Sequence, residues 1–364
     1  MVAAAHLYTP TRYLHQDRTC NRYDARVADE NPQVRLASRP EGRPSPANFT
    51  ITSGPVPQPR DGQVLIRTQY LSLDPYMRGR MSDAPSYAPP AKVGGVMPGG
   101  TVGEVVTSRD PGLSPGDVVL AYTGWQRYGV QQAAAVRKLD PAAAPVTTAL
   151  GVLGMPGFTA YAGLVKIGRP RAGETVVVAA ASGPVGATVG QLAKISGCRA
   201  VGIAGGPEKV AYLSTIGFDA AIDHRAPDFA GQLAAAVPDG IDVYFENVGG
   251  RVWDAVFPRL NPFARVPVCG LVAMYNATAE PAGPDRSAAL MHAILRKSLT
   301  LRGFIQNEFA AELMGEFLER ATGWVRDGSL RYKEDIVDGL ENAPEAFIGM
   351  LDGKNFGKLL IRVS

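Results

Sequence analysis

A glycine-rich turn between an apolar run and an amphipathic segment constrains the fold of this chain more than any other feature. Residues 175–181 form a continuous apolar run that predicts a buried strand, and residues 185–196 predict the helix after it. Between them, Ala181, Gly183 and Gly186 have the spacing A-x-G-x-x-G. Small residues let an anion approach the backbone, and the free N–H groups of a helix start bind it. The turn therefore predicts a site for the pyrophosphate of a dinucleotide.

The same residues also fit a plainer interpretation, an ordinary glycine-rich strand-to-helix turn in a flavodoxin-like protein. Ala181 stands where the usual dinucleotide motif has its first glycine, so the turn is a variant of that motif. We favour the dinucleotide site because strand, turn, helix and next strand follow one another in the required order.

Strands and helices continue to alternate beyond this turn. Further apolar runs that predict strands lie at residues 199–204, 220–223, 241–245, 265–269 and 299–304. Pro267 makes one of them irregular, because proline cannot donate a hydrogen bond to a sheet. Apolar strands in β–α alternation imply a parallel sheet that is buried on both faces. We therefore predict an α/β fold with a Rossmann doubly wound parallel sheet.

The first part of the chain, residues 33–140, is instead strand-rich. Predicted strands at residues 63–73, 100–107 and 118–122 are separated by turn signals such as Ser-Pro-Gly-Asp. This pattern is typical of a mainly β domain built as a partly open barrel. Residues 332–364 return to a strand-like pattern, and we expect a final strand at residues 358–363 to pack on this domain.

Composition excludes several classes of protein. The chain has 364 residues, enough for two domains, and a formal net charge of only +3, so we expect no nucleic-acid partner. No apolar run approaches the roughly 20 residues that cross a bilayer, so we expect no membrane partner. The three cysteines, Cys20, Cys198 and Cys269, are far apart, which argues against disulfides and favours a reducing cytoplasm. Residues 1–27 are expected to be a disordered extension or the result of an upstream start codon.

The region after the second Rossmann strand indicates which dinucleotide binds. An NAD site has an acidic residue there to bond the ribose 2′-hydroxyl, whereas residues 202–206 contain no acid. Lys209 follows shortly, and a cation attracts the 2′-phosphate of NADP. The alternative is a solvated lysine, although the first turn of a helix does not favour a cation.

Several motifs together resemble one known family. They are Gly154-Met-Pro-Gly-Phe-Thr-Ala-Tyr161, the turn at Ala181, Gly202-Ile-Ala-Gly-Gly-Pro-Glu-Lys209, Glu246-Asn-Val-Gly-Gly250, Asn355-Phe-Gly-Lys358 and Asp74-Pro-Tyr-Met-Arg-Gly-Arg-Met81. The chain resembles the zinc-independent medium-chain dehydrogenases/reductases, in the prostaglandin reductase and alkenal/alkenone double-bond reductase group. The resemblance runs from about residue 29 to the C-terminus.

The resemblance implies a GroES-like catalytic domain at residues 28–150 and 329–364 and a Rossmann domain at residues 151–328, with NADPH in the cleft between them. It implies NADPH-dependent reduction of a carbon–carbon double bond conjugated to a ketone or aldehyde. The residues expected to contact NADPH are Ser182, Gly183, Val185, Gly186, Lys209, His224, Asn247, Cys269, Tyr275, Phe304 and Asn355. His224 departs from the family, which has a tyrosine at this position, and Arg225 adds charge near the 2′-phosphate.

We expect no metal in this chain. Zinc-dependent relatives carry Gly-His-Glu where this chain has Gly99-Gly-Thr-Val-Gly-Glu104, so the imidazole is missing. A catalytic zinc needs three protein ligands, and His6, His15, His224 and His292 form no plausible cluster with the cysteines. Without a Lewis acid, enone reduction is favoured over alcohol dehydrogenation.

The resemblance implies one catalytic residue and two residues of the substrate pocket. Tyr275 matches the tyrosine that stabilises the enolate oxygen, and its alternative role is to shield the nicotinamide. Tyr76 and Tyr87 are expected to line the substrate pocket, with Trp125 as a weaker candidate. Arg78 is expected to be a structural cation that pairs across the two domains.

Two other functions fit the same sequence. A quinone oxidoreductase of the same superfamily would also use NADPH, and a non-catalytic NADPH sensor could share the fold. The family further implies a homodimer formed at the edge of the Rossmann sheet, around residues 299–304.

Overall fold

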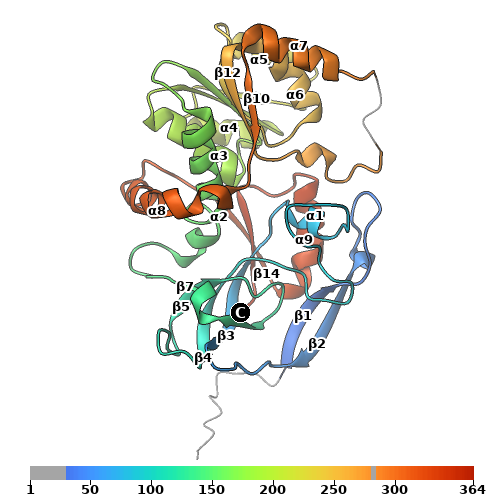
Figure 1. Ribbon diagram of the computed structural model, residues 1–364, viewed down its shortest axis with the longest axis vertical. Helices are drawn as coiled ribbons and strands as arrows, with labels where there is room; N and C mark the ends of the chain where they lie inside the picture. Colours follow the sequence, from blue (N-terminus) through green and yellow to red (C-terminus); the bar gives the residue numbers. More distant parts are fainter. Residues whose placement is uncertain (1–29, 280–283) are drawn as a thin grey trace, which may run out of the picture.

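The computed structural model describes residues 30–279 and 284–364, and the predicted extension at residues 1–27 lies outside this range. The protein has two lobes that meet near helices α2 and α8 (Figure 1). One lobe is built on a parallel sheet, and the other on a sheet that is antiparallel except for the parallel pair of β14 and β15. The predicted fold class is confirmed.

The first lobe contains six parallel strands in the order β10-β9-β8-β11-β12-β13. They are β8 (Thr175–Ala179), β9 (Arg199–Ala204), β10 (Ala220–Asp223), β11 (Ile241–Phe245), β12 (Leu260–Val268) and β13 (Thr300–Gly303). This order is that of a doubly wound dinucleotide-binding sheet. Strand β12 begins earlier than expected, and its irregularity lies between Leu260 and Arg265, where the register with β11 shifts and Phe263 has a φ of 65°. Pro267 pairs in regular register with Arg302 of β13, so the irregularity predicted at this proline lies earlier in the strand.

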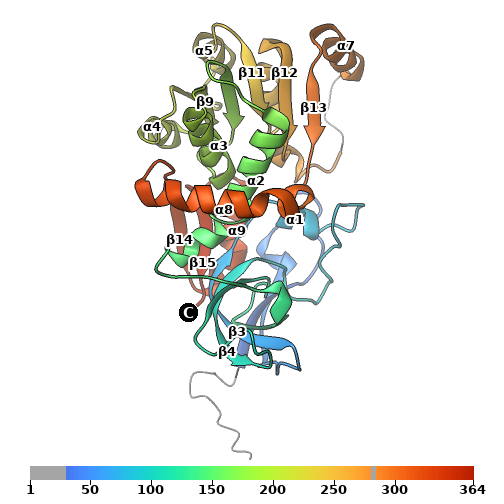
Figure 2. The same ribbon diagram turned by 60° about the vertical axis from the view of Figure 1, so that its left-hand side comes forward.

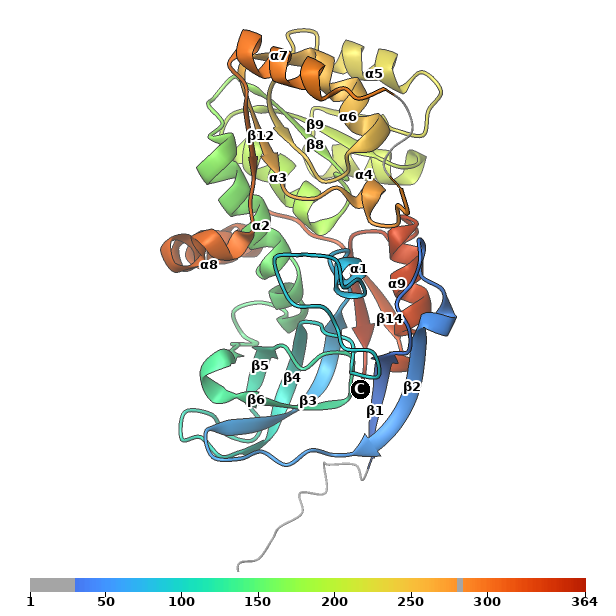
Figure 3. The same cartoon turned by 45° about the vertical axis from the view of Figure 1, so that its right-hand side comes forward.

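Helices cover both faces of this sheet. They are α2 (Met155–Gly163), α3 (Pro184–Ile195), α4 (Pro207–Thr215), α5 (Phe229–Ala236), α6 (Gly250–Val256), α7 (Ser287–Lys297) and α8 (Ala310–Asp327). Helices α2, α3 and α8 lie on one face (Figure 2), where Phe158 of α2 packs against Phe317 of α8 in a cluster that includes Val189 of α3. Helices α5 and α6 lie on the other face (Figure 3), where Leu233 of α5 and Val252 of α6 belong to one buried cluster. All five residues of β8 are buried between these layers, and the four that follow Thr175 are apolar.

The second lobe has a seven-stranded sheet in the order β14-β15-β3-β4-β5-β7, with β6 also paired to β3. Its strands are β3 (Gln63–Ser72), β4 (Thr101–Ser108), β5 (Val118–Ala121), β6 (Tyr128–Gln132), β7 (Arg137–Lys138), β14 (Glu334–Asp338) and β15 (Lys358–Arg362). A hairpin of β1 (Glu30–Leu36) and β2 (Phe49–Pro55) and the short helix α1 (Met77–Arg80) complete the lobe. As predicted, β15 returns the chain end to this sheet, antiparallel to β3.

One element of this lobe departs from the sequence-based prediction. Residues 332–364 are not wholly strand-like, because helix α9 (Ala343–Leu351) separates β14 from β15. Phe347 of α9 lies in the core, where its ring is 5.7 Å from that of Trp125. Trp125 also stacks on Phe49 and is completely buried, so it does not line a pocket. The strands fall inside the two predicted domains, whose exact boundaries stay predictions.

Within residues 30–279 and 284–364, no helix is both long enough and apolar enough to cross a membrane.

Candidate active site

The predicted pyrophosphate turn has the geometry of an anion cradle. Strand β8 ends at Ala179, Ala180 adopts a positive φ of 51°, and α3 begins directly after Gly183. A Cβ atom on Gly186 would lie 2.5 Å from the Ala180 carbonyl oxygen, so this position accepts only glycine. Among the described residues, no side chain caps the start of α3. The N–H groups of its first turn are therefore available to a phosphate, which fits a dinucleotide.

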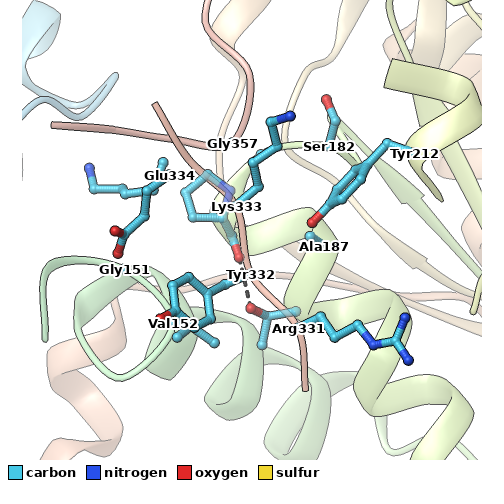
Figure 4. Close-up of a pocket in the computed structure, with 14 residues that line it drawn as sticks. Gly151, Val152, Ser182, Ala187, Tyr212, Arg331, Tyr332, Lys333, Glu334 and Gly357 are labelled. Atoms are coloured by element: carbon cyan, nitrogen blue, oxygen red, sulfur yellow. Dashed lines mark hydrogen bonds between the residues drawn. The ribbon is translucent and has the colours of Figure 1, made fainter. Parts of the chain in front are cut away.

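A narrow crevice lies beside this turn, between α3 and the C-terminal segment (Figure 4). It has room for about one water molecule. Ser182 and Tyr212 line it from the Rossmann lobe, and Tyr332 and Lys333 line it from the other lobe. Gln191 of α3 joins the two sides, because its side chain both donates to and accepts from the backbone of residue 331.

Three basic side chains gather where β9 and β10 end. A Cβ atom on Gly205 would lie 2.8 Å from His224 Nε2 and 3.0 Å from Arg225 Nε, so both side chains cover this glycine. Lys209 Nζ donates a hydrogen bond to the Gly353 carbonyl oxygen over 2.7 Å. Burial, followed by the charge of Arg225, lowers the pKa values of both Lys209 and His224. A bound anion would relieve this repulsion.

The loops after β11 and β12 carry the residues expected at the nicotinamide. Asn247 Nδ2 donates to the Ala179 carbonyl oxygen over 2.9 Å, which ties this loop to the pyrophosphate turn. Burial, with a smaller effect of Glu246, raises the pKa of the Cys269 thiol to about 12, so this cysteine is a neutral thiol at pH 7. Phe304 is buried, with its ring perpendicular to that of Phe245 at 6.1 Å.

Glu246 lies beneath both loops. Its Oε1 atom accepts hydrogen bonds from the Val248 N–H (2.7 Å), the Gly249 N–H (2.9 Å) and the Tyr244 hydroxyl (3.0 Å). Its Oε2 atom is buried and has no hydrogen-bond partner in the described part of the chain. Burial raises the pKa of this carboxyl group, against the opposing effect of the hydrogen bonds.

Four tyrosines lie around the nicotinamide-end loops. Tyr76 and Tyr122 lie near each other, and burial raises the pKa of both hydroxyl groups. Tyr87 lies near both of them and near Tyr275. Tyr122 and Tyr87 keep 56% and 61% of their surface accessible, so both are open to a ligand. The Arg80 guanidinium carbon lies 4.5 Å from the centre of the Tyr87 ring and holds it by a cation–π contact.

The Tyr275 hydroxyl lies over Gly270 of the same loop. A Cβ atom on Gly270 would lie 3.1 Å from the hydroxyl oxygen, so a side chain at this position would crowd it. Burial, followed by the neighbouring Cys269 and Tyr87, raises its pKa above the ordinary value of 10.0. Tyr275 therefore stays protonated at neutral pH.

Comparison with known proteins identifies the family. The family described as "N-terminal domain of oxidoreductase" matches residues 32–139, and "Zinc-binding dehydrogenase" matches residues 184–321. The NADPH-dependent curcumin reductase of Escherichia coli (strain K12) is 57% identical over 330 residues, which cover 90% of this chain and 96% of that protein. Prostaglandin reductase 1 of Oryctolagus cuniculus is 40% identical over 322 residues, which cover 87% and 89%. The crystal structure of CurA from Vibrio vulnificus in complex with NADPH has a TM-score of 0.88 and 51% identity, and the match covers 92% of this chain and 99% of that one.

The chain belongs to the zinc-independent medium-chain dehydrogenases/reductases. It falls in their prostaglandin reductase and alkenal/alkenone reductase group, and it is an oxidoreductase. Although one matching family is described by its zinc-binding members, the described residues hold no group of three or more His, Cys, Asp or Glu side chains that could bind a metal ion.

The fold of this reductase gathers the predicted site residues in two groups. Ser182, Gly183, Val185 and Gly186 form the pyrophosphate turn, with Lys209 and His224 at the adjacent strand ends. Asn247, Cys269 and Tyr275 lie on the two loops at the other end, with Tyr76 and Tyr87 nearby.

Two further predicted residues of the reductase lie apart from these groups. Asn355 follows α9, and its Nδ2 atom donates to the Gly357 carbonyl oxygen over 2.9 Å. Because the Phe356 ring meets that of Tyr212 at 5.2 Å, this segment reaches the pyrophosphate side. The side chain of Phe304 is the exception, since it belongs to the core.

Sequence reasoning missed two residues of the site, Tyr122 and Glu246. Tyr122 is the last residue of the strand predicted at residues 118–122, and a tyrosine at a strand end was the signal that could have identified it. Glu246 stands inside a motif that was quoted for the family, yet only the structure shows which donors its carboxyl group serves.

Proposed function

We propose that this protein is an NADPH-dependent reductase of the carbon–carbon double bond of α,β-unsaturated ketones and aldehydes. NADPH is the cofactor, and the uncapped start of α3 together with the basic group at Lys209, His224 and Arg225 supports its placement along the ends of the Rossmann strands. One observation carries the choice of reaction. The Tyr275 hydroxyl lies over Gly270, 3.1 Å from where a Cβ atom on that glycine would stand, and burial raises its pKa so that it keeps its proton.

Reduction of an enone adds a hydride at the β-carbon and a proton at the α-carbon. NADPH supplies the hydride when it is bound. Negative charge then develops on the carbonyl oxygen, and Tyr275 donates a hydrogen bond or its proton to that oxygen.

The other tyrosines bind and orient the substrate. Tyr76 and Tyr122 lie near each other, and Tyr87 is held in place by Arg80. Their rings offer apolar surface and their hydroxyls offer polar contacts, which suits a flat conjugated molecule with a carbonyl group. Cys269 takes no part as a nucleophile, because its raised pKa keeps the thiol neutral.

A substrate panel tests this proposal. NADPH oxidation is followed by its absorbance with enals, enones, saturated aldehydes and quinones, and product analysis shows which bond is reduced. We expect turnover of enals and enones to their saturated carbonyl compounds. Faster turnover of quinones would favour a quinone oxidoreductase, and tight NADPH binding without turnover would favour a sensor.

The variant Tyr275→Phe tests the donor role directly. Removing one donor to a developing oxyanion lowers turnover about 10²–10³-fold. We expect a loss of this size in kcat on enones, with NADPH affinity retained. Unchanged kcat would contradict the proposal that Tyr275 stabilises the enolate.

We further propose that the enzyme is a homodimer formed through the edge strand β13, in the cytoplasm. Strand β13 is the last strand of its sheet, and the adjacent helix α7 exposes Leu295 (82%) and Met291 (64%). An open strand edge beside exposed apolar side chains is a usual interface between copies. Light scattering after gel filtration should show a dimer, and Leu295→Glu should shift it towards the monomer.

A further inference from the structure

Two successive loops of the Rossmann lobe meet at one buried carboxyl group. The first loop, residues 246–250, follows β11 and carries Asn247, and the second, residues 269–276, follows β12 and carries Tyr275. Both are expected to contact the nicotinamide end of the cofactor. Glu246, the first residue of the first loop, is only 2% exposed.

The side chain of Glu246 shapes the first loop. Its Oε1 atom accepts from the N–H groups of Val248 and Gly249 at 2.7 and 2.9 Å, which turns the backbone around the carboxyl group. Gly249 and Gly250 both take positive φ values, 76° and 55°. These conformations reverse the chain into α6, and Asn247 lies inside the reversal.

The backbone of the same residues holds the second loop. The carbonyl oxygen of Glu246 accepts from the N–H groups of Cys269 (2.9 Å) and Gly270 (3.2 Å). The next two carbonyl groups, of residues 247 and 248, accept from Val272 (3.2 Å) and Ala273 (3.0 Å). The second loop therefore rests on the first along the whole stretch that leads to Tyr275.

We propose that Glu246 is a positioning residue, whose carboxyl group fixes the first loop and, through it, the second, so that Asn247 and Tyr275 are held for the cofactor and substrate. This inference rests on the cofactor placement proposed above. Glu246 acts through hydrogen-bond acceptance by Oε1 and makes no contact with the reacting atoms in this role. The amide oxygen of a glutamine can accept the same bonds, whereas alanine would leave two buried N–H groups without a partner.

Two variants and a matched control test the proposal. Glu246→Ala and Glu246→Gln are compared with Glu174→Ala, at the opposite end of the sheet. Glu174 also accepts from a backbone N–H, that of Arg171, and from Arg265, so its loss removes comparable bonds away from the cofactor. NADPH affinity is measured by the change in protein and nicotinamide fluorescence on binding, together with KM, kcat and the melting temperature.

We expect Glu246→Ala to weaken NADPH binding about tenfold or more and to lower kcat, since two unsatisfied N–H groups release the loop. Glu246→Gln should restore the affinity to within about threefold. Glu174→Ala should lower the melting temperature and leave NADPH affinity within about threefold. If Glu246→Ala does not fold, Glu246→Asp replaces it, because the shorter side chain cannot reach both N–H groups.

A folded Glu246→Ala enzyme with normal NADPH affinity and kcat would overturn the proposal, and so would an equal loss of affinity in Glu174→Ala. The variant Lys209→Ala distinguishes a wrong role for Glu246 from a wrong position of NADPH. If only the role of Glu246 is wrong, Lys209→Ala still weakens NADPH binding. If the cofactor lies elsewhere, neither variant changes its affinity.

Discussion

Arg78 Nε donates a hydrogen bond to Asn276 Oδ1 over 3.1 Å, and this bond joins α1 of the β lobe to the loop that carries Tyr275. The same guanidinium donates to the Gly42 carbonyl oxygen over 2.8 Å. Arg78 is buried. Its bond to Asn276 crosses between the two lobes, as expected for a structural cation at this position. Arg78 therefore holds the end of the loop at residues 269–276, while Glu246 holds its start.

Replacing Arg78 with methionine should impair catalysis more than cofactor binding. A charge-assisted hydrogen bond is worth about 1.5–3 kcal/mol, so we expect kcat/KM for an enone to fall about tenfold or more. NADPH affinity, measured by fluorescence, should change much less. Arg362→Met, which removes an exposed pair with Asp338, is the matched control and should leave both quantities unchanged. Equal enone kinetics in the Arg78 and Arg362 variants would contradict this role.

Lys209 and Arg225 should select NADPH over NADH. Each lies where the ribose 2′-phosphate is expected, so Lys209→Ala and Arg225→Ala should each weaken NADPH binding about tenfold. NADH lacks this phosphate, and its affinity should stay the same. Lys194→Ala removes a lysine that pairs with Asp219 and serves as the control. An equal loss of affinity for NADPH and NADH would show that these residues do not bind the 2′-phosphate.

Much of this architecture could be predicted because local sequence determines it. Strand β8 is apolar at every position after Thr175 and α3 follows a glycine-rich turn, so each residue's neighbours along the chain indicate its environment. The same holds for β9 and β10, whose bounds were predicted correctly. Helix α9 could not be predicted, because it is short and lies between two strands, in a stretch whose sequence pattern is strand-like.

The parts of the site that could not be predicted depend on contacts between distant segments. Glu246 looks like any acidic residue after a strand until its four neighbouring N–H groups and the second loop are seen in space. Tyr122 becomes a site residue only because Tyr76 is placed against it. The cluster of His224 and Arg225 over Gly205 likewise depends on how β9 and β10 pair.

The pH dependence of the enzyme should separate cofactor binding from catalysis. Burial raises the pKa of Tyr275 above 10.0, so this group stays protonated at lower pH. Up to about pH 10, deprotonation of Tyr275 should therefore not lower kcat at saturating NADPH. Burial and Arg225 lower the pKa of Lys209 below 10.5 in the free enzyme. Since Lys209 loses its charge as the pH rises, KM for NADPH should rise in alkaline solution while kcat holds.

Lys209→Arg checks the assignment of this alkaline change, because arginine keeps its charge. The rise in KM should then disappear or move to higher pH. An unchanged profile in Lys209→Arg would assign the titration to another group, and an early alkaline fall in kcat that is absent from Tyr275→Phe would contradict the raised pKa of Tyr275.

A buried ion pair should set the stability of the β lobe and the shape of its cleft. Lys358 Nζ donates to Asp74 Oδ1 over 2.8 Å and to the Leu73 carbonyl oxygen over 2.7 Å, and the two charged side chains are 3% and 7% exposed. The pair joins the end of β3 to the start of β15, just before Tyr76 and just after Asn355. Its loss should therefore disturb both ends of the cleft.

Lys358→Met leaves the Asp74 carboxylate buried without its cation, which should cost about 3–5 kcal/mol in the free energy of unfolding measured in urea. Adding Asp74→Asn removes that uncompensated charge, so the double variant should be more stable than Lys358→Met alone. The coupling energy of the double-mutant cycle then measures the pair itself. Lys194→Met, at a more exposed pair with Asp219, should cost at most about 1 kcal/mol. If Lys358→Met costs no more than Lys194→Met, the buried pair does not stabilise this lobe, and the position of Tyr76 must depend on the apolar core beneath α1.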